Sequence, residues 1–466
     1  LKLLVTGYTA LRIAECGCRS MRADGAHAAN YKALAPPASG AVEQPAPKRD
    51  EVKAGSGEVV QSSLFATTVN VTKGIIGSGM ITLPLAFHES SVLPGILLMA
   101  LSSFVSAFSF TLLGVACAAT GAETFHDLWT VTVGQSTAWA VQSAIMLDNS
   151  FTLWAYSTLV ADFVGKALVD LVPGIGLAHS RYVILGLMGT CIFAPLSYQQ
   201  TLDALKYTSG LGLCAIAYSC VVVFLEYIES GEGLAHIQLN FCALKFLAFK
   251  SSVLFAFSFG CHYSVPKVVT ELAQKSERRI GLVALGAFSS SLCIYIGFAL
   301  SGYARFGKAV AGNVLVNFEQ GNTAVLLMWI AMAASVITSY PMIFLSFKEN
   351  FYGMLGMPEK QASRKLRMTL VICGVSISCY LGAAVEDASV VMGICGALVS
   401  SAVQFCFPAL IFQNLPVGLR KGHKTSRTLL GFTKLLLAFG IFTAILGLWA
   451  TVSDALNGSH APPHDE

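Results

Sequence analysis

Apolar runs of near-bilayer length alternate with short polar stretches from Leu64 to Val452. A helix that crosses a membrane needs roughly 20 mostly apolar residues. The pattern predicts eleven crossing segments, at 65–88, 92–117, 138–165, 182–200, 206–226, 246–268, 280–303, 322–347, 368–386, 389–412 and 429–452. We therefore expect an all-α integral membrane protein.

The composition supports this class and distinguishes the two ends of the chain from the apolar region between them. The 466 residues are 55% hydrophobic and 12% charged, whereas soluble domains carry roughly 25% charge. Residues 1–60 are rich in Ala, Gly, Pro and charge, which predicts a disordered cytosolic tail. A transmembrane domain is expected at 61–453 and a short non-cytosolic tail at 454–466.

The basic residues predict the orientation of the chain. With the amino end in the cytosol, the most basic loops, around 275–279, 360–367 and 420–427, all fall on the cytosolic side. That distribution follows the positive-inside rule and agrees with an odd number of crossings. The carboxyl end is then extracellular or lumenal, in a plasma membrane or a vacuolar or lysosomal membrane. The expected partners are the lipid bilayer and a solute; no nucleic-acid partner and no oligomeric state are indicated.

The first segment reads "NVTKGIIGSGMITLPLAF" and combines length with helix-weakening residues. Gly74, Gly77 and Gly79 fall within six residues, and Pro84 follows. Glycine and proline weaken helices, and in lipid a helix is interrupted only where its freed backbone faces a cavity or protein. This segment therefore predicts a solute site inside the membrane, although glycines also allow close helix packing, which we favour for Gly74 alone.

The sixth segment, "FAFSFGCHYSVPKVVTEL", repeats the arrangement. Gly260 interrupts an apolar run and Pro266 follows six residues later. Breaks in segments one and six are typical of transporters built from two inverted five-helix halves. Helix amino termini can hold a carboxylate and freed carbonyls an ammonium group, so a zwitterionic amino acid suits such a site.

These two motifs resemble those of the amino acid/auxin permease family, and the likeness spans residues 60–453. The resemblance implies a five-plus-five inverted-repeat bundle, LeuT-like or APC, with an eleventh transmembrane helix and broken helices 1 and 6. It also implies secondary active transport of amino acids coupled to a proton or sodium gradient, without a catalytic cofactor. A sensor that binds amino acids without transporting them, or a uniporter of another small organic solute, could use the same architecture.

The expected substrate-binding residues surround the two breaks, with one aromatic residue from the third segment. They are Ile76, Gly77, Ser78, Gly79, Met80, Phe257, Ser258, Phe259, Gly260 and Tyr156. Tyr156 could close over the substrate or simply pack in the core. No span carries the HExxH, GxSG or GxGD patterns of intramembrane enzymes, so we expect no enzyme.

Two clues to the coupling ion conflict within four residues. In the resembled family an asparagine at the position of Asn70 is typical of sodium-coupled members, and Thr338 and Ser339 would complete that sodium site. Lys73 instead resembles a proton-coupled branch. Each residue also has a simpler interpretation. Asn70 could bond a neighbouring helix, Lys73 could extend to the interface, and the two hydroxyls could bond their own helix.

Two further polar residues are candidates for carrying a proton. Asp148 lies in the third segment, and a carboxylate inside a membrane is costly enough to suggest a function. It could carry a proton or pair with Lys73 or Lys250. His262 follows the sixth-segment break, where a titratable ring would be useful. No metal is expected beyond sodium at Asn70, Thr338 and Ser339.

Overall fold

The computed structural model describes residues 62–172, 180–199, 208–231, 246–357, 361–416 and 427–457, with the single positions 174, 176, 233, 235 and 237. The expected tail at 1–60 lies outside the described residues, as do residues 417–426 with Arg420, Lys421 and Lys424 of the expected basic loop. Within the described part the regular elements are helices, and Ser62 forms one isolated bridge with Leu272. The expected all-α class is confirmed.

The first crossing unit consists of three short pieces rather than one helix. Helix α2 (Leu64–Ile75) begins where the Ser63 hydroxyl accepts a hydrogen bond from the Ala66 amide at 3.2 Å. A 3₁₀ turn, η2 (Ser78–Thr82), follows, and helix α3 (Leu83–Ser90) begins with a proline in its first turn. Between α2 and η2, Gly77 is fully extended, with φ −139° and ψ −157°. The helical hydrogen-bond ladder therefore stops in the middle of the unit.

The sixth crossing unit is interrupted in the same way. Helix α11 (Ala248–Ser258) ends before Phe259, a 3₁₀ turn η7 (His262–Ser264) follows, and helix α12 (Val265–Glu271) completes the unit. Pro266 lies in the first turn of α12, where its missing N–H group costs nothing. Glycine and proline thus mark the two sides of each break.

The remaining elements are mostly long helices. They are α4 (Val92–Thr120), α5 (Phe125–Thr132), α6 (Ala138–Leu171), α7 (Arg181–Met188), α8 (Ala194–Tyr198), α9 (Thr208–Ser230), α13 (Glu277–Phe306), α14 (Thr323–Met354), α15 (Arg364–Ala384), α16 (Ala388–Cys395), α17 (Phe407–Asn414) and α18 (Arg427–Asn457). Two π-helical turns, η11 (Gly396–Ser400) and η12 (Ala402–Cys406), join α16 to α17, and a third, η5 (Gly189–Phe193), joins α7 to α8.

By length and composition, eight helices of the described residues could cross a membrane. The other three expected segments correspond to α6 and to the two interrupted units. The expected total of eleven crossings stays a prediction.

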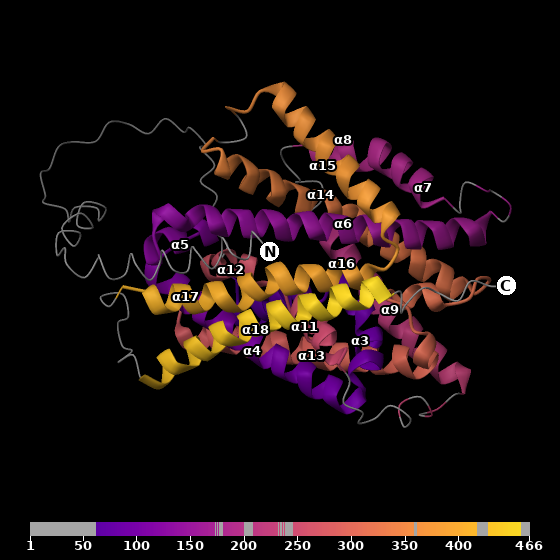
Figure 1. Cartoon of the computed structure of the whole chain (residues 1–466), viewed down its shortest axis with the longest axis horizontal. Helices are drawn as coiled ribbons and strands as arrows, with labels where there is room; N and C mark the ends of the chain where they lie inside the picture. The colour runs from indigo at the N-terminus through magenta and orange to yellow at the C-terminus, as the bar shows by residue number, and fades with distance from the viewer. Residues whose placement is uncertain are drawn as a thin grey trace, which may run out of the picture. The chain divides into compact units, whose positions relative to one another are not determined.

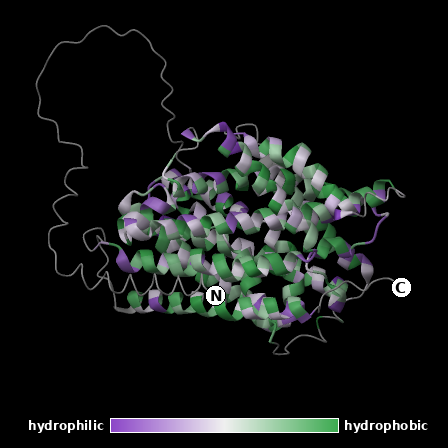
Figure 2. Cartoon of the chain, turned by 45° about the horizontal axis from the view of Figure 1, so that its top comes forward, coloured by the Kyte–Doolittle hydropathy of each residue, from purple (hydrophilic) through white to green (hydrophobic). Residues whose placement is uncertain are grey.

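The helices pack lengthwise around α6, which runs through the middle of the view in Figure 1. Helices α14 and α15 lie against α6, α13 packs on α2, α3 and α4, and α18 packs on α11 and α16. Hydrophobic residues run along most helices, and the more polar residues gather toward their ends (Figure 2).

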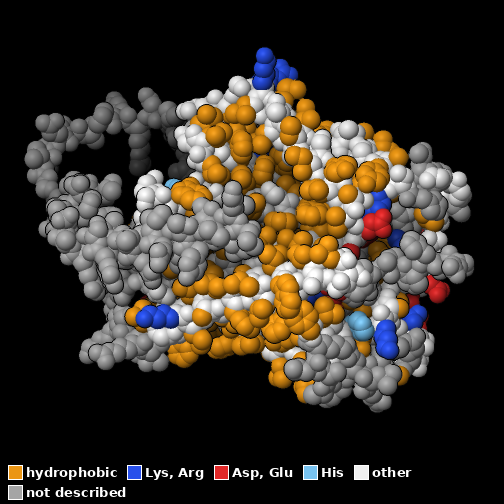
Figure 3. Space-filling view, in the orientation of Figure 1, with side chains coloured by type: hydrophobic (Ala, Val, Ile, Leu, Met, Phe, Trp, Pro, Cys, Tyr) orange, Lys and Arg blue, Asp and Glu red, His pale blue; other side chains and the backbone are white. Residues whose placement is uncertain are grey.

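The outer surface of the bundle is apolar. Large side chains such as Phe104 and Leu435 are 72% and 65% exposed. Figure 3 shows hydrophobic side chains over much of one face, with few charged groups. Such a surface is unsuited to water but matches lipid chains. The chain is a multi-pass membrane protein.

A buried ion cluster ties three helices together. The Lys250 ammonium on α11 donates to Glu89 Oε1 on α3 at 2.6 Å and to Asp454 Oδ2 on α18 at 2.7 Å. All three side chains are at most 3% exposed. The suggested pairing of Asp148 with Lys250 is therefore wrong, because two other carboxylates occupy the ammonium.

Candidate solute-binding site

A cavity of about 110 Å³ lies where the two interrupted units face each other. Its walls include backbone from both breaks, α6 and the π-helical turns before α17. Nine expected site residues line it: Gly77, Ser78, Gly79, Tyr156, Phe257, Ser258, Gly260, Asp148 and His262. The breaks, which lie far apart in sequence, thus contribute to one hollow.

The first break approaches the second so closely that a side chain at Gly79 has no room. A Cβ atom there would lie 2.9 Å from Ser258 Oγ and 3.1 Å from Ser258 Cα. The Ser258 hydroxyl contacts Gly79 O at 3.1 Å and Leu254 O at 2.8 Å. Glycine is required at position 79 because the backbones of the two units nearly touch.

The second break is held from the opposite side by Gln404 of η12. Its side-chain amide donates to Ala256 O at 2.8 Å, and a Cβ atom on Gly260 would lie 3.0 Å from the same nitrogen. Its carbonyl oxygen accepts a hydrogen bond from the Ser106 hydroxyl at 3.3 Å. A π-helical turn widens the helix by one residue, which often happens at functional sites, and here the turn brings Gln404 to the break.

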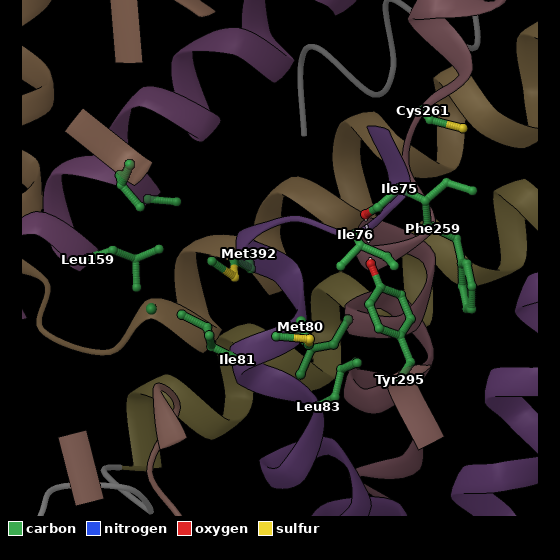
Figure 4. Packing of buried hydrophobic residues seen from close by; sticks show 14 of the residues in the cluster. Ile75, Ile76, Met80, Ile81, Leu83, Leu159, Phe259, Cys261, Tyr295 and Met392 are labelled. Atoms are coloured by element: carbon green, nitrogen blue, oxygen red, sulfur yellow. Dashed lines mark hydrogen bonds between the residues drawn. The ribbon is translucent and has the colours of Figure 1, made fainter. Parts of the chain in front are cut away.

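Tyr295 of α13 bridges the two breaks directly. Its hydroxyl lies 2.7 Å from Ile75 O, at the end of α2, and 2.9 Å from Ser258 O, at the end of α11. Figure 4 shows the ring pointing at the Ile75 carbonyl. Both oxygens are at helix ends, where carbonyls lack an intrahelical donor. One buried hydroxyl therefore serves both interrupted helices.

Tyr295→Phe is expected to destabilise this junction. Phenylalanine keeps the ring but removes the donor, leaving buried carbonyls unsatisfied at a cost of about 1–3 kcal/mol. The midpoint of thermal unfolding in detergent should fall, and solute binding should weaken with it. Tyr380→Phe is a matched control, since Tyr380 is 65% exposed on α15. Equal unfolding midpoints for both variants would contradict the bridging role.

His262 is almost completely buried, and its hydrogen bonds define which ring nitrogen carries the proton. Its Nε2 lies 3.1 Å from the carbonyl oxygen of Ser106 and 2.8 Å from the hydroxyl of Ser109. A carbonyl oxygen only accepts, so Nε2 is protonated. Nδ1 then carries a lone pair, is buried and has no hydrogen-bond partner among the described residues. A residue of the cavity lining therefore has a buried acceptor without a hydrogen-bond partner among the described residues.

Asp148 contributes the carboxylate of the cavity wall. Among the described residues its hydrogen-bond donor is the Cys395 thiol, at 3.5 Å from Oδ1. A thiol is a weak donor. The next residue, Asn149, also lines the cavity and donates to the Ser346 hydroxyl at 3.0 Å.

Three residues expected at the substrate are directed elsewhere. Ile76, Met80 and Phe259 are 5%, 0% and 0% exposed and do not line the cavity. Met80 contacts Cys220 of α9, and Phe259 packs on the Tyr295 ring at 5.2 Å between centroids. Neighbouring residues on a tight turn point to different sides, so only part of each motif can face the solute.

The residues expected to hold sodium do not line the cavity either. Asn70 is exposed, and Lys73 is half-buried on the same helix. The Thr338 hydroxyl contacts Ala334 O at 2.8 Å and Ser339 donates to Ser335 O at 2.8 Å, so both bond their own helix. Within the described residues, no group of three or more His, Cys, Asp or Glu could hold a metal ion.

Several lining residues were missed by the sequence interpretation: Gly74, Asn149, Thr152, Tyr263, Ser400 and Gln404. Gln404 had a usable signal, because it is a polar residue inside an apolar run. Gly74 was assigned to helix packing, yet a Cβ atom there would meet nothing within 4 Å. The π-helical turns that present Ser400 and Gln404 leave no obvious sequence pattern.

Comparison with solved structures shows the fold. The chain is similar to the inward-facing conformation of Mhp1, with a TM-score of 0.55, 10% identity and coverage of 85% of this chain and 92% of that one. It is also similar to a closed conformation of Mhp1, described as a nucleobase-cation-symport-1 family transporter, with a TM-score of 0.52, 11% identity and coverage of 85% and 94%. These neighbours have the LeuT fold.

Sequence comparison gives the family. The chain is 22% identical over 372 residues to vacuolar amino acid transporter 5 of Schizosaccharomyces pombe, covering 76% of this chain and 84% of the relative. It is 24% identical over 369 residues to human solute carrier family 38 member 8, covering 75% and 84%. The family model described as "Transmembrane amino acid transporter protein" matches residues 60–453. The chain therefore belongs to the amino acid/auxin permease family of transporters, not to an enzyme family.

Proposed function

We propose that this protein is a secondary active transporter that moves amino acids across a membrane, driven by a proton gradient. The observation that carries the proposal is the cavity between the two interrupted units, lined by Gly77–Gly79 and by Phe257, Ser258 and Gly260. The proposed architecture is a five-plus-five inverted repeat followed by α18 as the eleventh helix. In such transporters the solute binds at mid-membrane between the repeats.

The two breaks offer partners for both charged groups on the α-carbon of an amino acid, the carboxylate and the ammonium. The 3₁₀ turns that begin at Ser78 and His262 present backbone N–H groups, as helix amino termini do. Their partial positive charge would hold the substrate carboxylate. The ammonium group would find acceptors in the freed carbonyls and in the side chains of the cavity. Tyr156 of α6 and Ser78 of the first break line the same cavity, and Tyr156 would cover the bound substrate.

The arrangement of His262 supports protons as the coupling ion. His262 is among the residues that line the cavity, and its buried Nδ1 has no hydrogen-bond partner among the described residues, so a proton that enters with the substrate would have a nitrogen to bind beside the cavity. Asn70, Thr338 and Ser339, the alternative sodium set, are not at the cavity. A proton on Nδ1 would add a donor and a positive charge at the second break, and so couple the proton to the substrate.

The proposed orientation follows the basic loops. Arg364, Lys365 and Arg367 lie at the start of α15, and Arg278 and Arg279 lie at the start of α13. Placing both helix starts in the cytosol satisfies the positive-inside rule. The amino end would then be cytosolic and the carboxyl end extracellular or lumenal.

Uptake into proteoliposomes tests the function. Purified protein is reconstituted, and labelled amino acids are supplied with a pH gradient, a sodium gradient, both or neither. We expect accumulation against a concentration gradient only when protons flow down theirs. Equilibration without accumulation would identify a uniporter, binding without flux would identify a sensor, and accumulation driven by sodium alone would contradict proton coupling.

His262→Gln is expected to uncouple substrate transport from the proton gradient. Glutamine can still donate near Ser106 but cannot take up a proton, so pH-driven accumulation should fall to the level seen without a gradient. Exchange of internal for external substrate, which needs no net proton flow, should persist. His126→Gln, at a partly exposed position of α5, serves as control. Undiminished pH-driven accumulation by His262→Gln would remove His262 from the coupling mechanism.

A further inference from the structure

We propose that the transported amino acids carry a cationic side chain, such as that of arginine or lysine, and that Asp148 binds this cation. The inference rests on the proposed transport function and assigns the substrate class of the same cavity. It requires a negative site inside the cavity, a distance that suits a long side chain, and surroundings that favour a cation.

The permanent charge in the cavity wall of the described part is negative. Asp148 is its carboxylate, and the lining residues of the described part include no lysine and no arginine. Lys250 is already bound by Glu89 and Asp454, and Lys73 on α2 does not line the cavity. A carboxylate removed from water is costly unless it is paired. The weak thiol contact from Cys395 does not provide that pairing, whereas an ammonium or guanidinium group from the substrate would.

The spacing along α6 suits an extended substrate. Tyr156 lines the cavity together with Gly77–Gly79 of the first break. Asp148 precedes Tyr156 by eight residues on the same helix, which corresponds to roughly 12 Å along the axis. Both side chains line the same cavity. A substrate whose carboxylate and α-ammonium bind at the break would therefore present the end of a long side chain to Asp148.

The surroundings of Asp148 also favour a cation. Tyr263 also lines the cavity and is 47% exposed, so its ring is available to a ligand. Aromatic faces attract ammonium and guanidinium groups. The Thr152 hydroxyl supplies a further acceptor on the same wall. A side-chain carboxylate would instead meet Asp148 as a like charge, and so acidic amino acids should be excluded.

Matched substrates test the assignment. Citrulline has the shape of arginine without its charge, and norleucine is lysine without its ammonium group. Wild-type protein in proteoliposomes should prefer arginine over citrulline, and lysine over norleucine, by roughly 10- to 100-fold in kcat/KM, the range of one charge-assisted hydrogen bond. Asp148→Asn should bring both ratios close to one, mainly by raising KM for arginine and lysine.

The control is Asp170→Asn, the same change on the same helix, at a residue that accepts a hydrogen bond from the Gly321 amide outside the cavity. It should keep the wild-type ratios. The assignment is overturned if wild-type protein does not distinguish arginine from citrulline. It is also overturned if Asp148→Asn impairs both equally, as expected for a residue that binds the α-ammonium group or a proton.

A binding measurement separates this inference from the transport proposal. Thermal stabilisation of the purified protein by arginine or by citrulline needs no flux. If no amino acid is transported, the transport function fails, and the arginine preference in binding and its loss in Asp148→Asn still decide the role of Asp148. Equal stabilisation of wild-type protein by the two ligands would overturn the assignment.

Discussion

Gly79→Leu is expected to abolish amino acid uptake while leaving insertion into the membrane largely intact. Even a Cβ atom at this position would lie 2.9 Å from Ser258 Oγ and 3.1 Å from Ser258 Cα. The leucine side chain would have to push the two interrupted units apart or fill the cavity that they enclose. Forcing a large group into a packed site typically costs about 1–3 kcal/mol or more, and here the space it takes is the space of the substrate.

Surface expression and uptake measured on the same cells would separate the two effects. Gly297→Leu is the matched control, because Gly297 is also on a crossing helix, α13, and a Cβ atom there meets nothing within 4 Å. It should retain wild-type uptake. Normal uptake by a well-expressed Gly79→Leu protein would mean that the approach of Gly79 to Ser258 is not part of the solute site.

Lys250→Met is expected to be the most destabilising of the proposed substitutions. It leaves Glu89 and Asp454 buried without the ammonium that lies 2.6 and 2.7 Å from them. Removing one partner of a buried ion pair costs about 3–5 kcal/mol, because the remaining carboxylates lose the cation that offsets the cost of their burial. The thermal unfolding midpoint in detergent should drop sharply and the yield of monodisperse protein should fall.

Neutralising the whole cluster should restore much of this loss. Lys250→Met combined with Glu89→Gln and Asp454→Asn removes every charge of the cluster, and with the charges the cost of burying carboxylates without the ammonium. Lys308→Met, at an exposed position, controls for the loss of a lysine. If the triple variant unfolds at as low a temperature as Lys250→Met, the loss of the ammonium beside the two carboxylates is not the cause of the destabilisation.

The stability test bears on mechanism because of where the cluster lies. Lys250 is on α11, the first helix of the second interrupted unit, and Glu89 is at the end of α3, the last helix of the first. Asp454 adds α18. The cluster therefore fixes one end of both units to the last helix, while Tyr295 and Ser258 join them at the breaks.

Much of the fold was predictable because lipid imposes one simple rule. Backbone groups in a membrane must be bonded within the chain, so apolar runs of sufficient length predict helices, and α4, α13 and α14 lie where those runs lie. The breaks were visible for the same reason. A Gly-rich turn followed by proline inside such a run is unfavourable unless something compensates for it, which drew attention to Gly79 and Gly260 before any contact was known.

Side-chain direction was not predictable from the motifs. Gly77, Ser78 and Gly79 line the cavity, but Ile76 and Met80 on either side of them do not. The backbone at the break is neither helical nor strand-like, so no fixed periodicity assigns one residue to each face. For the same reason we expected Phe259 at the cavity, whereas it packs on Tyr295.

Long-range pairing was the second limit. Nothing local in the sequence says that Lys250 binds Glu89 and Asp454 rather than Asp148, since these partners lie 161 and 204 positions away along the chain. The sodium prediction at Asn70, Thr338 and Ser339 stays a prediction. It relied on resemblance for a meeting of two distant helices, and the two hydroxyls bond their own helix.

An experimental structure of the protein with arginine bound tests the central claim most directly. The amino acid should lie between Gly77–Gly79 and Ser258–Gly260, with its carboxylate on backbone N–H groups and its guanidinium group at Asp148. Arginine bound elsewhere, or helices that run unbroken through positions 77 and 260, would contradict the claim that the two interruptions form the substrate site.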